Sequence, residues 1–456
     1  MTDSVLIVGS GIAGLTAAQR VSAAGARAIV VERQPVIGGR LAAPMSKARA
    51  IGNRAEGEAV PLLDSLFADE KIECITNATL ASLEGRPGSF RATIRERARF
   101  VTDACTRCKL CHAVCPVVLP NEFDAGLTFR KAIYTPMIVT WPAAWAIDIE
   151  HCLNTPPNYL PCNRCASVCE DNAIHFDQPI ETLHERQVGA VILAPGMQIE
   201  SGDGYADLGY GAHPDVVTSA EMQRLLESPG PTGGFATRPS NEEYPASVLL
   251  VLDDPSPFTL YVVASQARQL LEQDIDKVAV LVLSQPTAEE AAQRLTETTG
   301  IDVHWGAAFQ AEPQDDNSIG VSFEDFGAGR YVRHSYEMVV LCVDMLPPEQ
   351  LPALAESVGA ALADDGFLAR AGDNGRAIET TRLGVYVAGC GSGPKNIHDS
   401  ITDATAAADA AVAKLNPILL DGDAAGQSAA TPTVQNDDLR AQIEKLLFAL
   451  VSQANP

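Results

Sequence analysis

The feature that most constrains this chain is a concentration of cysteines in the middle of its sequence. Of the 11 cysteines among 456 residues, eight lie between Cys105 and Cys169. A disulfide framework normally spreads cysteines through a small secreted domain. The N-terminal residues show no basic segment, long apolar core or cleavage site, so we expect no signal peptide. Clustered cysteines in a chain of this size therefore predict a metal-binding region.

The spacing of these cysteines indicates the kind of metal centre. The first run is Cys105-x2-Cys108-x2-Cys111-x3-Cys115 followed by Pro116, which is the spacing of bacterial two-cluster ferredoxins. The second run is Cys152 and then Cys162-x2-Cys165-x3-Cys169. It departs from the first run, because nine residues separate its first two cysteines and Glu170 stands where proline is usual. We expect two [4Fe–4S] clusters in a ferredoxin-like insertion.

By analogy with those ferredoxins, the fourth cysteine of each run ligates the cluster of the other run. The analogy assigns one cluster to Cys105, Cys108, Cys111 and Cys169. It assigns the other cluster to Cys115, Cys152, Cys162 and Cys165. A pair of zinc sites is the alternative, although zinc ribbons favour separated C-x2-C pairs.

Other residues near the cysteines receive structural predictions. The thiolates complete both ligand sets, so His112 and His151 are expected at the surface or behind the ligands rather than on metal. Cys74 and Cys342 are expected to be buried structural residues. The tryptophans Trp141 and Trp145 lie in the Pro- and Cys-rich insertion, and they are expected at its surface.

A second informative feature is the α/β pattern at the N-terminus. Residues 4–9 form an apolar strand, an Ala-rich helix extends to about Ala24, and residues 28–32 form the next strand. This β-α-β start predicts a doubly wound, Rossmann-like α/β fold.

The turn between that first strand and helix carries the G-x-G-x-x-G pattern at Gly9, Gly11 and Gly14. These glycines permit a tight turn, the approach of a pyrophosphate and close helix–strand packing, in that order. Glu32 ends the second strand, 18 positions after Gly14, where an acid can bind ribose hydroxyls. The pattern in this context predicts a dinucleotide site.

Charge and hydropathy exclude some partners. The formal net charge is −25, which repels nucleic acid and anionic membrane surfaces. No run of about 18 apolar residues exists, so no direct membrane insertion is expected. We therefore expect a cytoplasmic protein.

The α/β pattern resumes after the insertion. Apolar strands are predicted at 188–193, 247–252, 277–283, 338–343 and 385–390, and helices at 219–227, 258–273 and 400–414. The predicted divisions are a first dinucleotide-binding domain in three parts (1–100, 181–245 and 337–415), for which the flavoprotein resemblance given below implies FAD, the insertion (101–180), a second Rossmann-like domain (246–336), and a linker with a C-terminal helix (416–456).

The second Rossmann-like domain lacks the sequence of a nicotinamide site. After the strand at 247–252 the chain reads Leu252-Asp253-Asp254-Pro255-Ser256. No glycine is present, and two acids stand where a pyrophosphate would bind, so the phosphates would meet repulsion. We expect a degenerate NAD site.

Three segments resemble the two-dinucleotide-binding-domain flavoproteins: Gly38-Gly39-Arg40, Ala194-Pro195-Gly196, and residues 385–393. The resemblance implies FAD, with the last segment near the flavin. Many relatives have Asp where Cys390 stands. Besides the residues already named, the implied FAD contacts are Ile12, Ala13, Arg33, Gly389, Cys390, Lys395 and Ile397.

A more specific resemblance covers residues 1–415. The flavin and ferredoxin motifs together resemble the A-type iron–sulfur subunits of heterodisulfide reductase and their bacterial relatives. Shared stretches include Arg130–Tyr134, Ile147–Cys152, Ala173–Gln178, Gly230–Gly234, Glu379–Thr381, Ala388–Cys390 and Gly393–Lys395. The family's further cysteine-rich sites are missing, since residues 41–73 and 247–275 contain none. The chain thus resembles the shorter versions in sulfur-oxidising bacteria, or the flavoprotein subunits of quinone-interacting complexes beside sulfate reduction.

This resemblance implies an oxidoreductase subunit for electron transfer in sulfur metabolism, passing electrons between FAD and the clusters. It implies B- and C-type heterodisulfide-reductase-like subunits as partners and a homodimeric core. No catalytic acid, base or nucleophile is expected. The alternatives are a flavoprotein subunit of a quinone-interacting complex, a self-contained NAD(P)H oxidoreductase, and a scaffold that has lost its cofactors.

Overall fold

The computed structural model describes residues 3–39, 69–136, 141–227, 230–283, 288–372 and 378–415. The chain divides into two compact units, of which the second comprises Asn121–Thr128 and Gln198–Leu346 and the first comprises the rest. Each unit is treated separately below. Arg40 and the predicted linker and C-terminal helix (416–456) lie outside the described residues.

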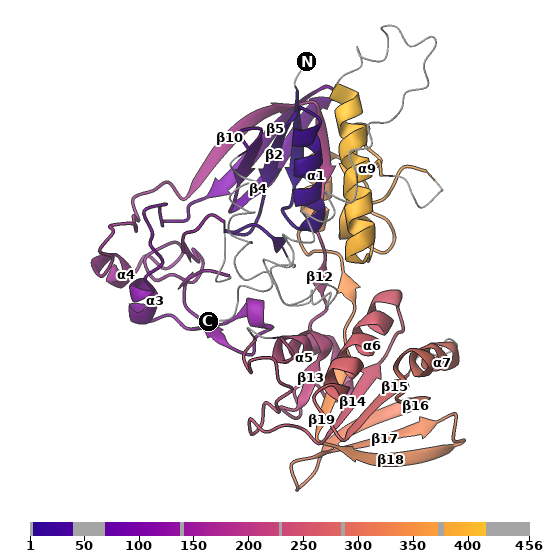
Figure 1. Cartoon of the computed structure of the whole chain (residues 1–456). Helices are drawn as coiled ribbons and strands as arrows, with labels where there is room; N and C mark the ends of the chain where they lie inside the picture. The colour runs from indigo at the N-terminus through magenta and orange to yellow at the C-terminus, as the bar shows by residue number, and fades with distance from the viewer. Residues whose placement is uncertain are drawn as a thin grey trace. The chain divides into compact units, whose positions relative to one another are not determined.

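Unit 1 is organised around a five-stranded parallel sheet (Figure 1). Its strands are β1 (Ser4–Val8), β2 (Arg27–Val31), β3 (Ile72–Ile75), β11 (Ala190–Leu193) and β21 (Val385–Val387). The order β21-β11-β1-β2-β3 corresponds to that of half of a doubly wound fold. Strands covered on both faces read as continuous apolar runs, which is why the sequence pattern predicted β1, β2 and β11.

Both faces of this sheet are covered. On one face the helices α1 (Ile12–Ala23) and α9 (Ile397–Leu415) lie side by side (Figure 1), and their alanines pack into the core beneath. The other face packs against α8 (Leu351–Val358) and an antiparallel sheet of β4 (Ala78–Arg86), β5 (Ser89–Arg97) and β10 (Glu181–Val188). Small side chains let α1 and α9 approach each other closely. Because the strands of the sheet are parallel, their carboxyl ends meet at one edge.

The insertion follows β5 in the chain and has little regular structure. Its elements are α3 (Leu110–Val114), β6 (Leu119–Pro120), η3 (Glu122–Asp124), β7 (Phe129–Arg130), β8 (Ile133–Tyr134), β9 (Ala146–Ile147) and α4 (Arg164–Ser167). A small core of its own holds Phe100, Ile133, Trp145 and Ile147 together with the cysteines. Trp145 is 6% exposed, so its predicted surface position is wrong; long-range packing against the core buries it.

Unit 2 is built on a seven-stranded sheet in the order β13-β19-β14-β15-β16-β17-β18. The strands are β13 (Val216–Thr218), β14 (Ser247–Leu252), β15 (Lys277–Val282), β16 (Asp302–Pro313), β17 (Ile319–Asp325), β18 (Arg330–Tyr336) and β19 (Met338–Cys342). The helices α5 (Ser219–Leu225), α6 (Pro257–Leu271) and α7 (Ala288–Thr299) cover one face. Short elements complete the described chain: β12 (Gln198–Ile199), η4 (Gly202–Leu208), β20 (Met345–Leu346) and η5 (Gly389–Ser392).

The edges of unit 2 differ from the domain boundaries drawn from the sequence. The prediction placed residues 337–343 in the FAD-binding domain, but β19 pairs with β14 on one side and β13 on the other. Apolar runs of β19 and β21 look alike in sequence, and only pairing tells which sheet each joins.

A buried ion pair in unit 2 allows a stability prediction. Asp215 is fully buried and accepts hydrogen bonds from Arg238 Nε (3.0 Å), Ser240 N (2.9 Å) and Ser240 Oγ (2.7 Å). Replacing it by alanine leaves Arg238 buried without its carboxylate, which destabilises a protein by about 3–5 kcal/mol. We expect Asp215→Ala to lower the denaturant midpoint accordingly, whereas Asp315→Ala, at an exposed position of the same unit, should leave it unchanged.

Candidate functional site

The glycine-rich turn lies between β1 and α1 and is shaped by contacts within the protein. Gly9 has φ +103°, and a Cβ there would lie 2.1 Å from the carbonyl oxygen of Ala194. A Cβ on Gly14 would lie 1.8 Å from the carbonyl oxygen of Gly9. Packing therefore requires glycine at both positions, whatever binds the turn.

Gly11 has no such requirement. Its φ of −68° suits any residue, and a Cβ added there would meet no protein atom within 4 Å. It is the N-cap of α1, which has no side-chain cap and no acidic residue in its first turn. A helix start whose amides lack a side-chain acceptor, next to open space, suits an anion such as a pyrophosphate.

Glu32 holds this turn in place from the end of β2. Its buried carboxylate accepts hydrogen bonds from Ser10 N (2.8 Å), Ser10 Oγ (2.5 Å) and Gln34 N (2.7 Å). Ser10 also accepts a bond from the amide of Gly38 (3.1 Å). The acid thus orders the glycine turn and the following loop, and of its roughly four lone-pair sites one is left for a ribose hydroxyl.

The predicted residues of the loop after Glu32 divide in two. Gly38 and Gly39 have φ of +114° and +57°, and a Cβ on Gly39 would lie 2.9 Å from the Cα of Gly11, so this loop lies against the glycine turn. Arg33 instead is exposed and donates to the side chain of Gln350.

Two further predicted turns meet the glycine turn at the same edge of the sheet. Ala194 N donates to Val8 O (2.8 Å), which places the Ala194–Gly196 turn beside it. A Cβ on Gly389 would lie 2.9 Å from Cβ of Ala13, near the start of α1. A Cβ on Gly391 would meet Pro195 at 2.9 Å. The turns after β1, β11 and β21 therefore form one site, as the carboxyl ends of parallel strands do in doubly wound folds.

The segment before α9 carries a charge cluster that the sequence did not reveal in full. Lys395 Nζ donates to Asp403 and to Ser392 Oγ (3.0 Å). Arg370 binds the same two partners, and its Nη2 lies 3.3 Å from Asp403 Oδ2. The predicted Lys395 is thus held by an ion pair, while Arg370 and Asp403 had no local sequence signal. Ile397 begins α9.

Cys390 lies in the same segment. Its Sγ is 3.5 Å from the carbonyl oxygen of Lys395. Burial raises the pKa of the Cys390 thiol, so the group is a neutral side chain at neutral pH.

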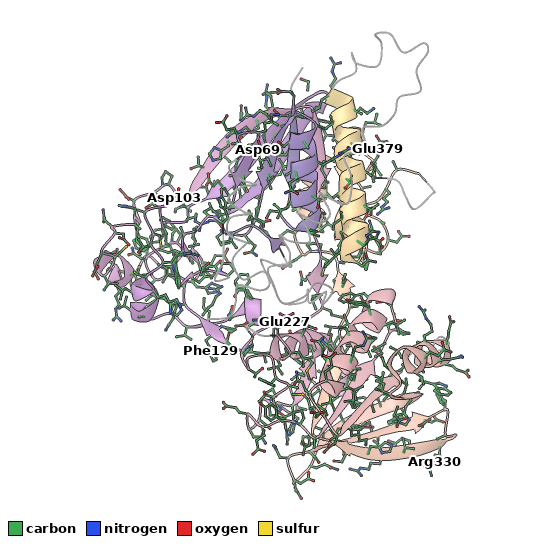
Figure 2. The ribbon with its side chains drawn as sticks, in the orientation of Figure 1. Asp69, Asp103, Phe129, Glu227, Arg330 and Glu379 are labelled. Carbon is green, nitrogen blue, oxygen red and sulfur yellow. The ribbon has the colours of Figure 1, made fainter. Side chains whose placement is uncertain are left out.

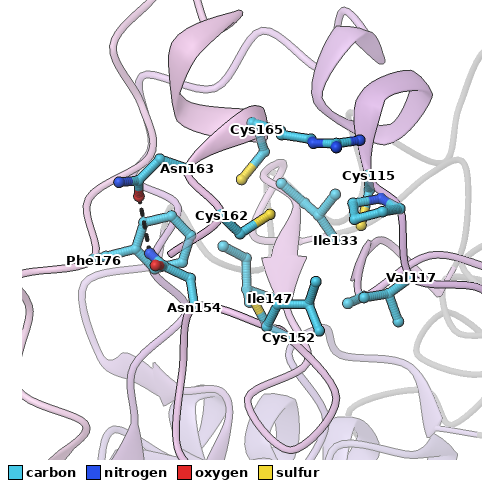
Figure 3. Close-up of a pocket in the computed structure, with 14 residues that line it drawn as sticks. Cys115, Val117, Ile133, Ile147, Cys152, Asn154, Cys162, Asn163, Cys165 and Phe176 are labelled. Atoms are coloured by element: carbon cyan, nitrogen blue, oxygen red, sulfur yellow. Dashed lines mark hydrogen bonds between the residues drawn. The ribbon is translucent and has the colours of Figure 1, made fainter. Parts of the chain in front are cut away.

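Four of the eight clustered cysteines line one pocket in the insertion (Figure 3). They are Cys115, Cys152, Cys162 and Cys165. The wall between them is apolar, with Val117, Ile133, Ile147 and Phe176, and a hydrogen bond from Asn154 to Asn163 (3.0 Å) ties its two cysteine-bearing loops. The structure thus brings together the set that the ferredoxin analogy assigned to one cluster, including the one member from the first run.

The other four cysteines form a second group. Burial raises the pKa of Cys111 to about 11, and the nearby Cys105, Cys108 and Cys169 add to the rise. Cys169 comes from the second run, and its Sγ accepts the amide of Ala173 (3.3 Å). Cys108 is the exposed member, while Cys105 and Cys169 are half-buried.

The geometry of these groups is not that of a mononuclear ion site. Among the residues that the structure describes, no three His, Cys, Asp or Glu side chains converge closely enough for a metal ion. A [4Fe–4S] cluster makes a different demand, because its thiolates bind separate irons and so surround a body rather than a point.

The remaining predicted residues of the insertion have other partners. The ring of His112 packs on Trp145, 5.4 Å between centroids. His151 is exposed and its Nδ1 lies 3.0 Å from Asp148. Two cysteines outside the insertion were also expected to be buried. Cys342 is buried as predicted, whereas Cys74 is half-buried.

The strand-to-helix turn of unit 2 differs from the glycine turn of unit 1. After β14 come Asp253 and Asp254, and α6 is capped by Ser256, whose Oγ accepts the amide of Thr259 (3.1 Å). Burial and the neighbouring Asp254 and Glu200 raise the pKa of Asp253. This helix start is occupied by its own side chains and faces acids.

The fold and the three-turn site define a class: the chain is built as a two-dinucleotide-binding-domain flavoprotein, which confirms the predicted fold class. Residues 7–51 match the family of NAD(P)-binding Rossmann-like domains. Among solved structures, the thioredoxin reductase of T. acidophilum is similar, with a TM-score of 0.45 and 14% identity over 90% of this chain and 98% of that one.

Sequence relatives identify the family. An A-type iron–sulfur subunit of the CoB–CoM heterodisulfide reductase of Methanopyrus kandleri is 32% identical over 457 residues, 96% of this chain and 67% of the relative. The corresponding subunit of Methanocaldococcus jannaschii is 32% identical over 426 residues, 89% of this chain and 63% of its own length. The chain belongs to this family, the A-type iron–sulfur subunits of heterodisulfide reductase, as its motifs predicted. It spans 63% of the length of several of these relatives.

Among the helices in the described part of the chain, none has both the length and the apolar character needed to cross a membrane.

Proposed function

We propose that this protein is the electron-transfer flavoprotein subunit of a heterodisulfide-reductase-like complex, and that it passes electrons between FAD and two [4Fe–4S] clusters in sulfur metabolism. The observation that carries the proposal is the juxtaposition within unit 1. A three-turn dinucleotide site and two groups of four cysteines share one unit. The loop after Glu32, which belongs to the dinucleotide site, is hydrogen-bonded to the insertion that holds the cysteines. Ile37 N of the loop donates to Trp141 O of the insertion (3.0 Å).

The residues fit FAD. Gly11 leaves room where the pyrophosphate would lie, and the uncapped start of α1 would face it. Glu32 would bind the ribose, and the Gly38–Gly39 and Ala194–Gly196 turns would line the same site. Bound FAD would supply two-electron chemistry. Lys395, held by its ion pair with Asp403, would contribute positive charge near the flavin ring of FAD. Such a charge would favour the anionic reduced form of the flavin.

The cysteines fit two cubane clusters. In this proposal one cluster is held by Cys105, Cys108, Cys111 and Cys169, and the other by Cys115, Cys152, Cys162 and Cys165. Each set combines three thiols of one run with one of the other. The clusters would supply one-electron steps, and the apolar wall at Ile133 and Ile147 would limit water around the second one.

The chain's own part in the reaction is to bind, orient and tune its cofactors. Chemistry on a sulfur compound is proposed to belong to partner subunits. B- and C-type subunits, as in the family's complexes, and a second copy of this chain are the proposed partners. The acidic charge of −25 argues against nucleic acid.

The direct test is anaerobic purification of the full chain, with its partners where they co-purify, followed by iron, sulfide, zinc and flavin analysis. We expect about eight irons, eight sulfides and one FAD per chain, as two cubanes and one dinucleotide site require. Zinc in place of iron would reject the clusters, and a preparation without flavin after gentle handling would reject the FAD site.

A second prediction concerns nicotinamide donors. Since α6 of unit 2 is capped by its own serine and faced by Asp253 and Asp254, the protein should not bind a pyrophosphate there. We expect NADH and NADPH to leave the flavin absorbance unchanged when no partner is present, whereas dithionite bleaches it. Rapid bleaching by NADH alone would instead support a self-contained NAD(P)H oxidoreductase.

A further inference from the structure

Arg99 is a buried cation at the junction between the flavin-binding part of unit 1 and the insertion. It follows β5, and its side chain donates to the carbonyl oxygens of Pro35, Ala144 (2.6 Å) and Trp145 (3.3 Å) and to Thr76 Oγ1 (3.4 Å). Pro35 belongs to the loop after Glu32, and Ala144 and Trp145 belong to the insertion. One guanidinium therefore holds together the two parts that would carry the redox centres.

The charge of Arg99 is not neutralised by a carboxylate in the described chain. Its hydrogen-bond acceptors are carbonyl and hydroxyl oxygens, and its Nε is buried with no hydrogen-bond partner. Burial lowers the pKa of Arg99, and Asp103, Tyr134, Cys105 and Glu96 act in the opposite direction. A buried cation without a paired anion is costly, and a bound cluster with four thiolate ligands would bring compensating negative charge.

Arg99 lies near the group formed by Cys105, Cys108, Cys111 and Cys169, because Cys105 acts on it electrostatically, and three hydrogen bonds tie the segment that follows Arg99 to the same group. Along the chain, Thr102 N donates to Ala173 O (2.8 Å), and Ala173 N donates to Cys169 Sγ (3.3 Å). Cys105 N donates to Thr102 O (3.1 Å).

From the other side, the indole of Trp145 packs on His112, the residue after Cys111. Arg99 binds the backbone oxygen of Trp145, so the guanidinium and the loop segment at His112 share Trp145 as a neighbour.

We propose that Arg99 sets the reduction potential of the cluster held by Cys105, Cys108, Cys111 and Cys169, and favours its reduced form. The inference rests on the proposed function. A cluster with four thiolate ligands is a net anion and gains one more negative charge on reduction. A fixed cation nearby stabilises the more negative state, and burial preserves the effect from solvent screening.

The chain offers a matched control two residues away. Arg97 carries the same charge on the same segment, but its side chain is 46% exposed and pairs with Glu150 at 3.2 Å. Exposed charges are screened. Arg97→Gln should therefore leave both cluster potentials unchanged, whereas Arg99→Gln removes a buried charge.

The experiment is an EPR-monitored redox titration of anaerobically purified full-length Arg99→Gln, Arg99→Met and Arg99→Lys, with Arg97→Gln and wild type. Iron, sulfide and flavin contents are measured on each sample. In both neutral variants we expect the reduction potential of one of the two clusters to fall by about 59 mV. That shift corresponds to a tenfold change in the equilibrium constant of its one-electron reduction. Arg99→Lys keeps the charge and should restore most of the potential.

Several outcomes would overturn the proposal. Loaded neutral variants with wild-type potentials would show that the charge has no redox role. Loss of iron from both neutral variants would show that Arg99 has only a structural role. An equal shift of the reduction potential in Arg97→Gln would show that any nearby positive charge has the same effect, including an exposed one. A wild-type protein without cluster signals would reject the proposed function itself, which distinguishes that failure from this one. Asp103 (Figure 2) is exposed and lies two positions before Cys105 in the sequence, and its replacement by asparagine makes the opposite charge change on a residue outside the ligand sets.

Discussion

Replacing Gly11 with alanine is expected to weaken FAD binding at least about tenfold and to leave the fold intact. The reason is the asymmetry among the three glycines of the turn. A Cβ at position 11 meets no protein atom within 4 Å, and the backbone there has φ −68°, so the apoprotein can accept the methyl group. Bound FAD cannot, because its pyrophosphate must approach that backbone. We expect at least about a tenfold loss of FAD affinity, equivalent to roughly 1.4 kcal/mol.

The measurement is flavin binding to apoprotein by fluorescence quenching, with thermal unfolding of the apoprotein beside it. The unfolding free energy should change by less than about 0.5 kcal/mol for Gly11→Ala. Gly14→Ala is the contrasting variant, since its Cβ would lie 1.8 Å from Gly9 O, and overpacking of this kind destabilises by about 1–3 kcal/mol. Wild-type flavin affinity in Gly11→Ala would contradict the placement of the pyrophosphate.

The elements that the sequence predicted well are those whose signal is local. The run SVLIV of β1 predicts a buried strand, and the glycine turn after it predicts a dinucleotide site, all within about a dozen residues. The cysteine runs are local in the same sense, because their spacing reflects how one short loop wraps a metal centre. Patterns of this kind depend on only a few neighbouring residues, and they were sufficient to predict both the family and the fold class.

What the sequence did not reveal depends on long-range packing. Arg99 meets Pro35 and Trp145 only in the folded chain, and Arg370 meets Asp403 33 positions away. Trp145 was expected at the surface because it lies in the Pro- and Cys-rich insertion, yet the core around Ile133 and Ile147 buries it. The antiparallel strands β16 to β18 alternate weakly, and their pairing alone makes them strands. In each case the partner, not the residue, decides the environment.

The second large effect is expected from serine substitutions that cross the two cysteine runs. Cys115 belongs to the first run but lies around the pocket with Cys152, Cys162 and Cys165. If that pocket holds a cluster, Cys115→Ser and Cys162→Ser should both lose the same EPR signal. Because a cubane with a missing thiolate is lost or degraded, the iron content should fall from about eight to about four per chain.

The matching pair tests the other group. Cys111 and Cys169 come from different runs and act on each other electrostatically, so Cys111→Ser and Cys169→Ser should both lose the second signal and keep the first. Cys74→Ala, at a half-buried cysteine of β3, should keep both. If instead each run lost its own signal, with Cys115→Ser resembling Cys111→Ser, the ligands would not be exchanged between runs. The four thiols around the pocket would then not bind one cluster. The exchange of ligands between the two runs is therefore the most direct chemical test of the two clusters proposed for this insertion.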